Sequence, residues 1–209
     1  ESGEAVDRDD ATGEVAINST NFSAIMHNVV SQLALAMKAD PTADRAIQAI
    51  KDGERPVIGL ANTMEAFIRD FAESEGIAVG EAINLNFSHL MKRYLDRTRR
   101  VSIKDADGNR RHFTMPVEMM DPQVADAYYA AVETIEAAGL ESLPISPIDW
   151  ISNRLRKAGH SVGEITGRGV IIDYSGKLPV LATRPAIATK PAGKRKTIQD
   201  FNDGKVDVV

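Results

Sequence analysis

The chain has no cysteine, few aromatic residues and no long apolar run. Its 209 residues include 1 Trp, 4 Tyr and 6 Phe. Without cysteine the protein cannot form disulfides, attack a substrate with a thiolate or hold zinc through sulfur, and a reducing cytoplasmic setting is the expectation. No stretch approaches the roughly 18 consecutive apolar residues of a membrane-spanning helix, and no basic start followed by an apolar run indicates a secretory signal. We therefore expect a cytoplasmic protein with no membrane partner.

Metal-binding patterns are missing from the sequence as well. The histidines are scattered, with no pair at metal-ligand spacing: His27, His89, His112 and His160. The segment 105–109 superficially resembles a calcium loop, but its glycine comes too early and no glutamate follows at the required spacing. We expect no metal site here. Because the first residue is Glu1, we also expect the sequence to be an excised or processed piece.

Charge is distributed unevenly along the chain. The net charge of −5 argues against a protein that simply coats nucleic acid. The segment 92–111 is nevertheless rich in Lys and Arg, and a second basic stretch without acids contains Arg184, Lys190, Lys194, Arg195 and Lys196. Local basic patches can contact phosphates whatever the total charge. A solvated surface held by salt bridges is an equally good interpretation of either patch.

Helical spacing of apolar residues dominates the first quarter of the chain. Residues 1–20 are acidic and polar and are expected to be a flexible lead-in. The spacing that follows predicts a helix from about 21 to 38 and a shorter one from about 42 to Gly53. Pro56–Leu60 is then a short apolar run bounded by turn residues, which is typical of a buried parallel strand. A helix over 64–75 follows, with Asn62 or Thr63 as its cap.

The same α/β rhythm returns near the end of the chain. Ser146-Pro147 begins a predicted helix over 147–158, and a short strand over 162–166 follows. Next come a predicted hairpin over 170–181, a helix over 194–202 and a strand over 206–209. Alternation of strands and helices predicts an α/β domain. Because the last predicted strand has nothing after it, we expect this domain to be truncated at a strand.

Residues 76–143 interrupt that rhythm and are interpreted as an insertion. A helix is predicted near 87–97, and another opens at Asp121-Pro122 and closes at Gly139. Between them, residues 101–103 and 112–114 flank Asp107-Gly108-Asn109, a pattern that predicts a β-hairpin. The insertion is therefore expected to be α+β.

The ordered motifs resemble the second motor lobe of a known helicase family. The first motif is the run from Pro56 through Gly59 and Asn62 to Ala66. The second is Ile165-Thr166-Gly167, followed by a basic helix leading to Phe201, a turn at Asp203-Gly204 and the strand Val206–Val209. On these motifs the chain is similar to strawberry-notch-type superfamily 2 helicases, particularly bacterial and phage members, over about 22–75 and 144–209. The first motif is the more specific of the two.

The resemblance implies a fold. We expect an α/β domain with a RecA-like parallel sheet flanked by helices, and an α+β insertion that contains the β-hairpin. In this interpretation 21–75 provides helices and the first strand–helix unit, 76–143 is the insertion, and 144–209 is the truncated remainder of the lobe.

The resemblance also implies an ATP-dependent enzyme of which this chain is a fragment. In such motors ATP and Mg²⁺ lie between two RecA-like lobes. The sequence contains no G-x-x-x-x-G-K-[ST] phosphate loop, so we expect this fragment alone to bind neither and assign no catalytic residue. The implied partners are nucleic acid, with DNA preferred to RNA, the first RecA-like lobe of the same protein and a DNA methylase module.

Nucleic-acid contacts are expected at two turns and at the hairpin. Asn62 and Thr63 precede a helix whose first N–H groups could bind phosphate, and related motors grip the backbone there. Thr166, Gly167 and Arg168 follow the next strand, where glycine allows close approach and the guanidinium could pair with phosphate. The hairpin would add Arg99 and Arg100. Capping, turning and protection of a strand edge from aggregation are the alternative roles of these residues.

Two other functions remain as alternatives. The chain could be a scaffold without motor activity whose insertion at 76–143 binds a protein partner. A metabolic nucleotide-binding domain is a weaker interpretation, because no glycine-rich dinucleotide fingerprint follows either central strand.

Overall fold

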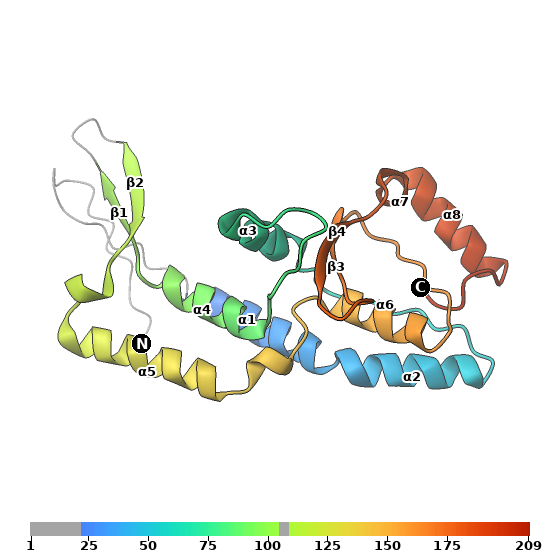
Figure 1. Cartoon of the computed structure of the whole chain (residues 1–209), viewed down its shortest axis with the longest axis horizontal. Coiled ribbons are helices and arrows are strands. Elements are labelled where there is room, and N and C mark those ends of the chain that lie inside the picture. Colours follow the sequence, from blue (N-terminus) through green and yellow to red (C-terminus); the bar gives the residue numbers. More distant parts are fainter. Residues whose placement is uncertain (1–21, 105–108) are drawn as a thin grey trace. The chain divides into compact units, whose positions relative to one another are not determined.

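A computed structural model describes residues 22–104 and 109–209 (Figure 1). The predicted lead-in and the turn residues Asp107 and Gly108 lie outside these ranges. The chain divides into two compact units. Unit 1 consists of residues up to Val30 together with Ser88–Leu140, and unit 2 consists of Ser31–Phe87 together with Glu141–Val209.

Unit 1 is built from helices and one hairpin. Its elements are the start of α1 (Phe22–Met37), most of α4 (Phe87–Arg97), β1 (Arg100–Lys104), β2 (Arg110–Thr114), a 3-10 turn (Val117–Met119) and α5 (Pro122–Ala137). The helices predicted near 21–38, 87–97 and after Asp121 are confirmed, as is the antiparallel hairpin. A second 3-10 turn, Leu140–Ser142, follows α5.

The start of α5 shows why the sequence predicted it well. Asp121 accepts a hydrogen bond from the backbone N–H of Gln123 at 2.9 Å, and Pro122 occupies the first helical position. This side-chain cap satisfies an N–H group that has no partner within the helix, and proline loses nothing at that position.

Unit 2 has its core between α2 (Ala39–Lys51) and α6 (Pro147–Lys157). The buried cluster there consists of Ala39, Ala43, Ala46, Ile151, Leu155 and Val208. Alanines on α2 let α6 approach closely, and polar contacts fix the crossing at its exposed side. Asp40 accepts hydrogen bonds from Trp150 Nε1 at 2.8 Å and Arg154 Nη1 at 2.6 Å. The Trp150 hydrogen bond is the main cause that holds the pKa of Asp40 below its usual range.

The remaining elements of unit 2 are α3 (Glu65–Glu75), β3 (Val170–Asp173), β4 (Val180–Thr183), α7 (Ala186–Thr189) and α8 (Pro191–Asn202). β3 and β4 pair antiparallel, which confirms the predicted hairpin near the end of the chain. The segment before α4 extends this sheet through a bridge between Ala82 and Val180. The helix predicted over 194–202 begins slightly earlier, because Pro191 starts it.

The expected RecA-like parallel sheet flanked by helices is wrong. Within the described ranges, the regular strands form only two antiparallel hairpins, β1–β2 and β3–β4. The runs Pro56–Leu60, 162–166 and 206–209, which were predicted to be parallel strands, are extended segments without regular pairing.

These three segments nevertheless lie side by side in unit 2. Val162 and Val208 form a parallel bridge, and Val209 donates to Pro56 O at 3.3 Å and accepts from Ile58 N at 2.7 Å. Alternation of this kind is the pattern of neighbouring parallel strands. Central parallel strands are buried on both faces, whereas Val57 is 70% exposed. The run Pro56–Leu60 is therefore buried on one side only. Its apolar composition indicated a strand buried on both faces, and the structure has an extended segment instead.

Two glycines allow α8 to pack closely on its surroundings. A Cβ added at Gly163 would lie 2.6 Å from Thr197 Cγ2. A Cβ added at Gly193, inside α8, would overlap the carbonyl oxygen of Ile187 and lie 2.9 Å from Ala188 Cα. The backbone of α7 cannot move away as easily as a side chain could, so Gly193 is required by packing.

We expect Gly193→Ala to destabilise the protein by about 2 kcal/mol, the range of overpacked cores, although alanine favours an isolated helix by about 1 kcal/mol over glycine. Gly59→Ala is the matched control, because nothing lies within 4 Å of its added Cβ. Urea unfolding of both variants measures the difference. Equal stability of the two variants would contradict the packing role.

Candidate nucleic-acid interface

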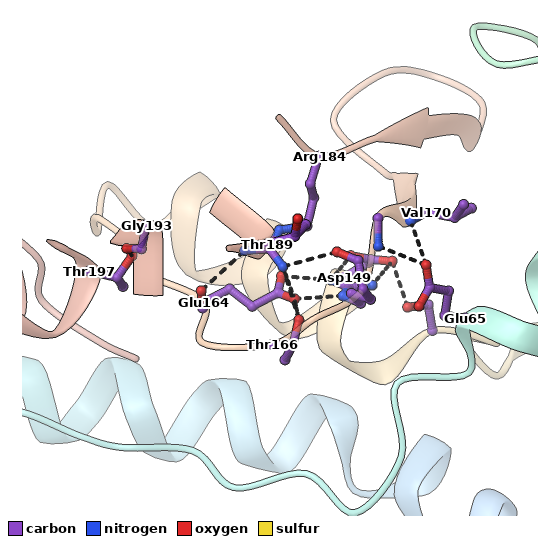
Figure 2. Close-up of polar contacts among 12 residues, drawn as sticks. Glu65, Asp149, Glu164, Thr166, Val170, Arg184, Thr189, Gly193 and Thr197 are labelled. Atoms are coloured by element: carbon purple, nitrogen blue, oxygen red, sulfur yellow. Dashed lines mark hydrogen bonds and ion pairs between the residues drawn. The ribbon is translucent and has the colours of Figure 1, made fainter. Parts of the chain in front are cut away.

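The loop 164–169, called the Gly167 loop below, is held by a buried arginine. Arg168 is 2% exposed. Its guanidinium donates to both carboxylate oxygens of Asp149, at 2.9 and 2.5 Å, and to both oxygens of Glu164, at 2.7 and 2.8 Å (Figure 2). Planar, bidentate pairing of this kind is the strongest arrangement an arginine can make with carboxylates.

Asp149 connects three parts of unit 2. Besides Arg168, its carboxylate accepts from the Ser146 hydroxyl at 2.6 Å and from the backbone N–H of Ile172 at 2.8 Å. The side chain is 6% exposed. One carboxylate on α6 therefore positions the start of its own helix, the Gly167 loop and strand β3.

A second arginine fixes the backbone of the Gly167 loop. Arg184, just after β4, donates to the carbonyl oxygens of Glu164 at 3.1 Å and Arg168 at 3.3 Å. It also donates to the Thr166 hydroxyl at 2.9 Å and pairs with the Glu164 carboxylate at 3.0 Å. The Thr166 hydroxyl in turn donates to Glu164. We call Asp149, Glu164, Arg168 and Arg184 the arginine network.

The network shifts the pKa values of Glu164 and Arg168. Burial by itself raises the pKa of Glu164, but the hydrogen bonds and positive charge of Arg168 outweigh it and hold that pKa below its usual range. Burial likewise lowers the pKa of Arg168, and the hydrogen bonds and charges of Glu164 and Asp149 raise it further than burial lowers it. Glu164 and Arg168 are therefore both charged at neutral pH.

The turn 61–64, called the Asn62 turn below, lies next to the Gly167 loop. Glu65, the first residue of α3, accepts from the backbone N–H groups of Gly169 at 2.7 Å and Val170 at 3.0 Å (Figure 2). Burial raises the pKa of Glu65, but these two N–H donors and Arg69 lower it below its usual range. A single carboxylate thus joins two turns that are far apart in the sequence.

The Asn62 turn itself is strained. Met64 has φ of 58°, and it is the one described non-glycine residue with a positive φ. The Asn62 side chain accepts from the N–H of Met64 at 2.8 Å, and the Met64 side chain is 5% exposed. A left-handed methionine costs roughly 1–2 kcal/mol. Burial of its side chain and the Asn62 hydrogen bond offset that cost, which fixes the backbone where α3 begins.

Lys194 adds positive charge beside the Gly167 loop. Its ammonium nitrogen lies 3.7 Å from the position that a Cβ on Gly167 would occupy. Around the loop, three carboxylates are matched by three guanidinium groups: Glu65, Asp149, Glu164, Arg69, Arg168 and Arg184. The ammonium of Lys194 is a further positive charge beside these ion pairs.

The structure places the sequence-predicted residues as follows. Asn62 and Gly167 are exposed, while Thr63 and Thr166 are half-buried, and the Glu65 hydrogen bonds bring their two turns together. Arg168 points into the interior, where its guanidinium already donates to the carboxylates of Asp149 and Glu164. Its burial does not agree with the expected role of pairing with phosphate, and the geometry makes it a residue that holds the loop.

Arg99 and Arg100 belong to unit 1 and have different environments. The side chain of Arg99 is 14% exposed. It donates to Asp96 at 2.5 Å and to Met115 O at 2.9 Å, and it lies over the Tyr128 ring at 4.7 Å. Arg100 is exposed at the start of β1. Arg99 therefore fastens the base of the hairpin, and Arg100 is the one of the pair that a ligand can reach.

Three residues of this interface were missed by the sequence analysis: Glu65, Asp149 and Glu164. Arg184 and Lys194 were noted there only as members of a basic stretch. Ser146 and Asp149 have the spacing of a capping box, which is a usable signal for Asp149. That signal indicates only part of the role, because the Asp149 carboxylate accepts from the Ser146 hydroxyl at the start of α6 and also pairs with Arg168. The other residues carry no local pattern that distinguishes them from ordinary surface charges.

Comparison of the chain with protein-family models, with curated proteins and with solved structures found no match. Among the residues that the structure describes, no group of three or more His, Cys, Asp or Glu side chains could hold a metal ion. Over the same ranges, every helix is too short or too polar to cross a lipid bilayer.

We expect Arg168→Met to cost about 3–5 kcal/mol of unfolding free energy, because it leaves the buried Asp149 without its charged partner and Glu164 with Arg184 alone. Arg154→Met is the matched control: its partners Asp40 and Asp44 are 55% and 62% exposed, so the loss should stay below about 1 kcal/mol. Urea unfolding followed by circular dichroism measures both. A loss of similar size in the two variants would contradict the role of Arg168 as a buried ion-pair partner.

Acid should weaken the parent protein more than it weakens Glu164→Gln. The unfolded chain binds a proton at the ordinary glutamate pKa of 4.5, whereas the folded protein holds that pKa lower. The stabilisation from Glu164 is therefore complete above pH 4.5 and is lost as pH falls through the folded value. Unfolding free energies measured between neutral and acid pH should show the two proteins converging. A constant difference in unfolding free energy between the two proteins at every pH would exclude a contribution from ionised Glu164.

Proposed function

We propose that the chain is part of an ATP-dependent nucleic-acid helicase or translocase, and that it contributes contacts to the nucleic-acid backbone. The observation that carries the proposal is the pair of hydrogen bonds from Gly169 and Val170 to Glu65, which brings the Asn62 turn beside the Gly167 loop. These are the two turns that the helicase resemblance singles out.

The chemistry of this surface suits a phosphodiester better than a small catalytic ligand. Gly167 offers backbone without a side chain, Lys194 supplies an ammonium beside it, and Asn62 and Thr63 precede the first turn of α3. Glycine allows close approach of a ligand to the backbone, and a lysine contacts phosphate as a point charge. Acid–base or nucleophilic catalysis is not part of the proposal, because the buried acids are fully engaged by arginines.

In this proposal the chain does not supply an ATP site of its own. The sequence has no phosphate-binding loop, and no step of ATP hydrolysis is assigned to it. ATP and Mg²⁺ belong to the full-length protein in this proposal. The first motor lobe of that protein and a DNA methylase module are its proposed partners, DNA is the preferred nucleic acid, and the cytoplasm is the proposed setting.

We expect Lys194→Ala to weaken nucleic-acid binding several-fold at about 0.1 M salt and to make the salt dependence shallower by about 0.9 in log–log slope, the loss of one phosphate contact. Fluorescence anisotropy with a labelled DNA duplex, its single strand and the matching RNA measures affinity, slope and preference. Arg195→Ala is the matched control, since it removes the same charge from the next, exposed position of α8.

Lys194→Arg should keep the salt dependence of binding at the parent value, because it keeps the positive charge. Absence of any nucleic-acid binding by the parent protein would overturn the proposal. It would favour the scaffold alternative, for which unit 1 offers exposed apolar side chains at Met119, Val124 and Tyr129.

A further inference from the structure

Two backbone N–H groups and one guanidinium converge on a single oxygen atom at the start of β3. Gly169 N and Val170 N donate to Glu65 Oε1 at 2.7 and 3.0 Å (Figure 2). Arg69 Nη2 donates to the same oxygen at 2.9 Å. Successive backbone N–H groups of this kind make a concavity that binds anions. We call Gly169 N, Val170 N and the Arg69 guanidinium the oxyanion site.

The group that occupies the oxyanion site identifies the chemistry that it accepts. Burial raises the pKa of Glu65, but the two N–H donors and Arg69 lower it below its usual range, so the occupant is an anion at neutral pH. A phosphodiester oxygen is an anionic acceptor like the carboxylate oxygen, and both receive charge-assisted hydrogen bonds. Backbone N–H groups and arginine side chains are also among the donors that contact phosphate in nucleic-acid complexes.

Glu65 is held less firmly than Asp149, the other carboxylate that accepts from β3. Asp149 accepts from Ile172 N at 2.8 Å, but its side chain is 6% exposed and Arg168 donates to both of its oxygens. The Glu65 side chain is 21% exposed, and that of Arg69 is 52% exposed. A carboxylate at the surface can return to water at little cost, whereas a buried one cannot. Glu65 is therefore the carboxylate that a ligand can replace.

The oxyanion site keeps its shape when the Glu65 side chain leaves it. The arginine network holds the Gly167 loop independently of Glu65. Helix α3 lies against β3, and its Ile68 side chain is fully buried. The Asn62 turn and the Gly167 loop therefore remain neighbours, and the two N–H groups stay in place for another oxyanion.

We propose that the oxyanion site binds a phosphodiester of nucleic acid, and that Glu65 occupies it in the free protein and leaves it on binding. The contact of Glu65 is autoinhibitory, because affinity falls by the fraction of molecules in which the site is already filled. The inference rests on the proposed function, since it needs nucleic acid as the ligand. It extends the phosphate contact from Gly167 and Lys194 to the start of β3.

The first test is Glu65→Ala in the complete chain. If Glu65 fills the site in about nine molecules of ten, freeing it strengthens binding about tenfold. We expect at least about fivefold tighter binding of a labelled DNA duplex by fluorescence anisotropy near 0.1 M salt. The matched control is Glu73→Ala, which removes the same charge from an exposed position about 12 Å further along α3. Screening at that distance should keep its effect below about twofold.

Glu65→Asp separates the occupied site from the charge. The shorter side chain keeps its negative charge but no longer reaches both N–H groups, so we expect binding at least about threefold tighter than that of the parent. Nuclear magnetic resonance gives a second measurement. The amide signals of Gly169 and Val170 should shift in both Glu65 variants without ligand, and shift again when DNA is added.

Arg69→Ala tests the site even if the Glu65 variants do not fold, which thermal unfolding shows. Its log–log salt slope should be shallower by about 0.9, the loss of one phosphate contact. An unchanged slope would overturn the inference, because the guanidinium would then contact no phosphate.

The remaining outcomes separate this inference from the proposed function. Equal affinities of Glu65→Ala and Glu73→Ala would overturn the inference, and so would parent-like binding by Glu65→Asp, which would leave only an effect of charge. In either case, weaker binding by Lys194→Ala would leave the proposed function standing. If inorganic phosphate shifted the two amide signals and DNA did not, the ligand would be a free phosphate and the nucleic-acid assignment would be wrong. Absence of DNA binding by every protein would overturn both.

Discussion

The buried pair between Asp149 and Arg168 is the interaction on which unit 2 depends. The Gly167 loop contains Gly163, Gly167 and Gly169 within or beside it, so apolar side chains cannot hold it in place. Removing two charges from water costs several kcal/mol for each ion. That cost is offset only because every oxygen of Asp149 and Glu164 meets a guanidinium, a hydroxyl or a backbone N–H. The network fixes the conformation of the Gly167 loop more than it adds net stability. In this conformation Gly167 is exposed beside Lys194.

Helices and hairpins could be predicted from the sequence because their signals are local. Asp121-Pro122 fixes the start of α5, and apolar spacing fixes the buried side of α6. The parallel sheet could not be predicted correctly, because pairing between distant segments is not a local property. Pro56–Leu60 has the composition of a buried strand, yet Val57 is exposed, although Ile58 and Leu60 pack against the core and Val209 pairs with the backbone. Composition indicated burial on both faces, and the tertiary structure provides it on one.

The candidate site shows the same division between local and distant information. Asn62, Thr63 and Gly167 were found from their place after apolar runs, and the structure does bring their turns together. Arg168 stands between two glycines, a context that indicates an exposed turn. Its burial depends on Asp149, which is 19 residues away, and the turn's neighbour Glu65 is 104 residues from Gly169. No spacing rule connects residues so far apart, so the role of each could be assigned only from coordinates.

Net charge sets a limit on how such a chain could hold nucleic acid. At −5, the protein as a whole repels a polyanion, but charges separated by more than about 8 Å are largely screened at physiological salt. Binding is then decided by the charges within that distance of the phosphates. Around the Gly167 loop the arginine network is neutralised internally, which leaves Lys194 to act alone. A contact made by one ammonium beside a fixed loop would therefore contribute more to the positioning of a phosphate than to affinity.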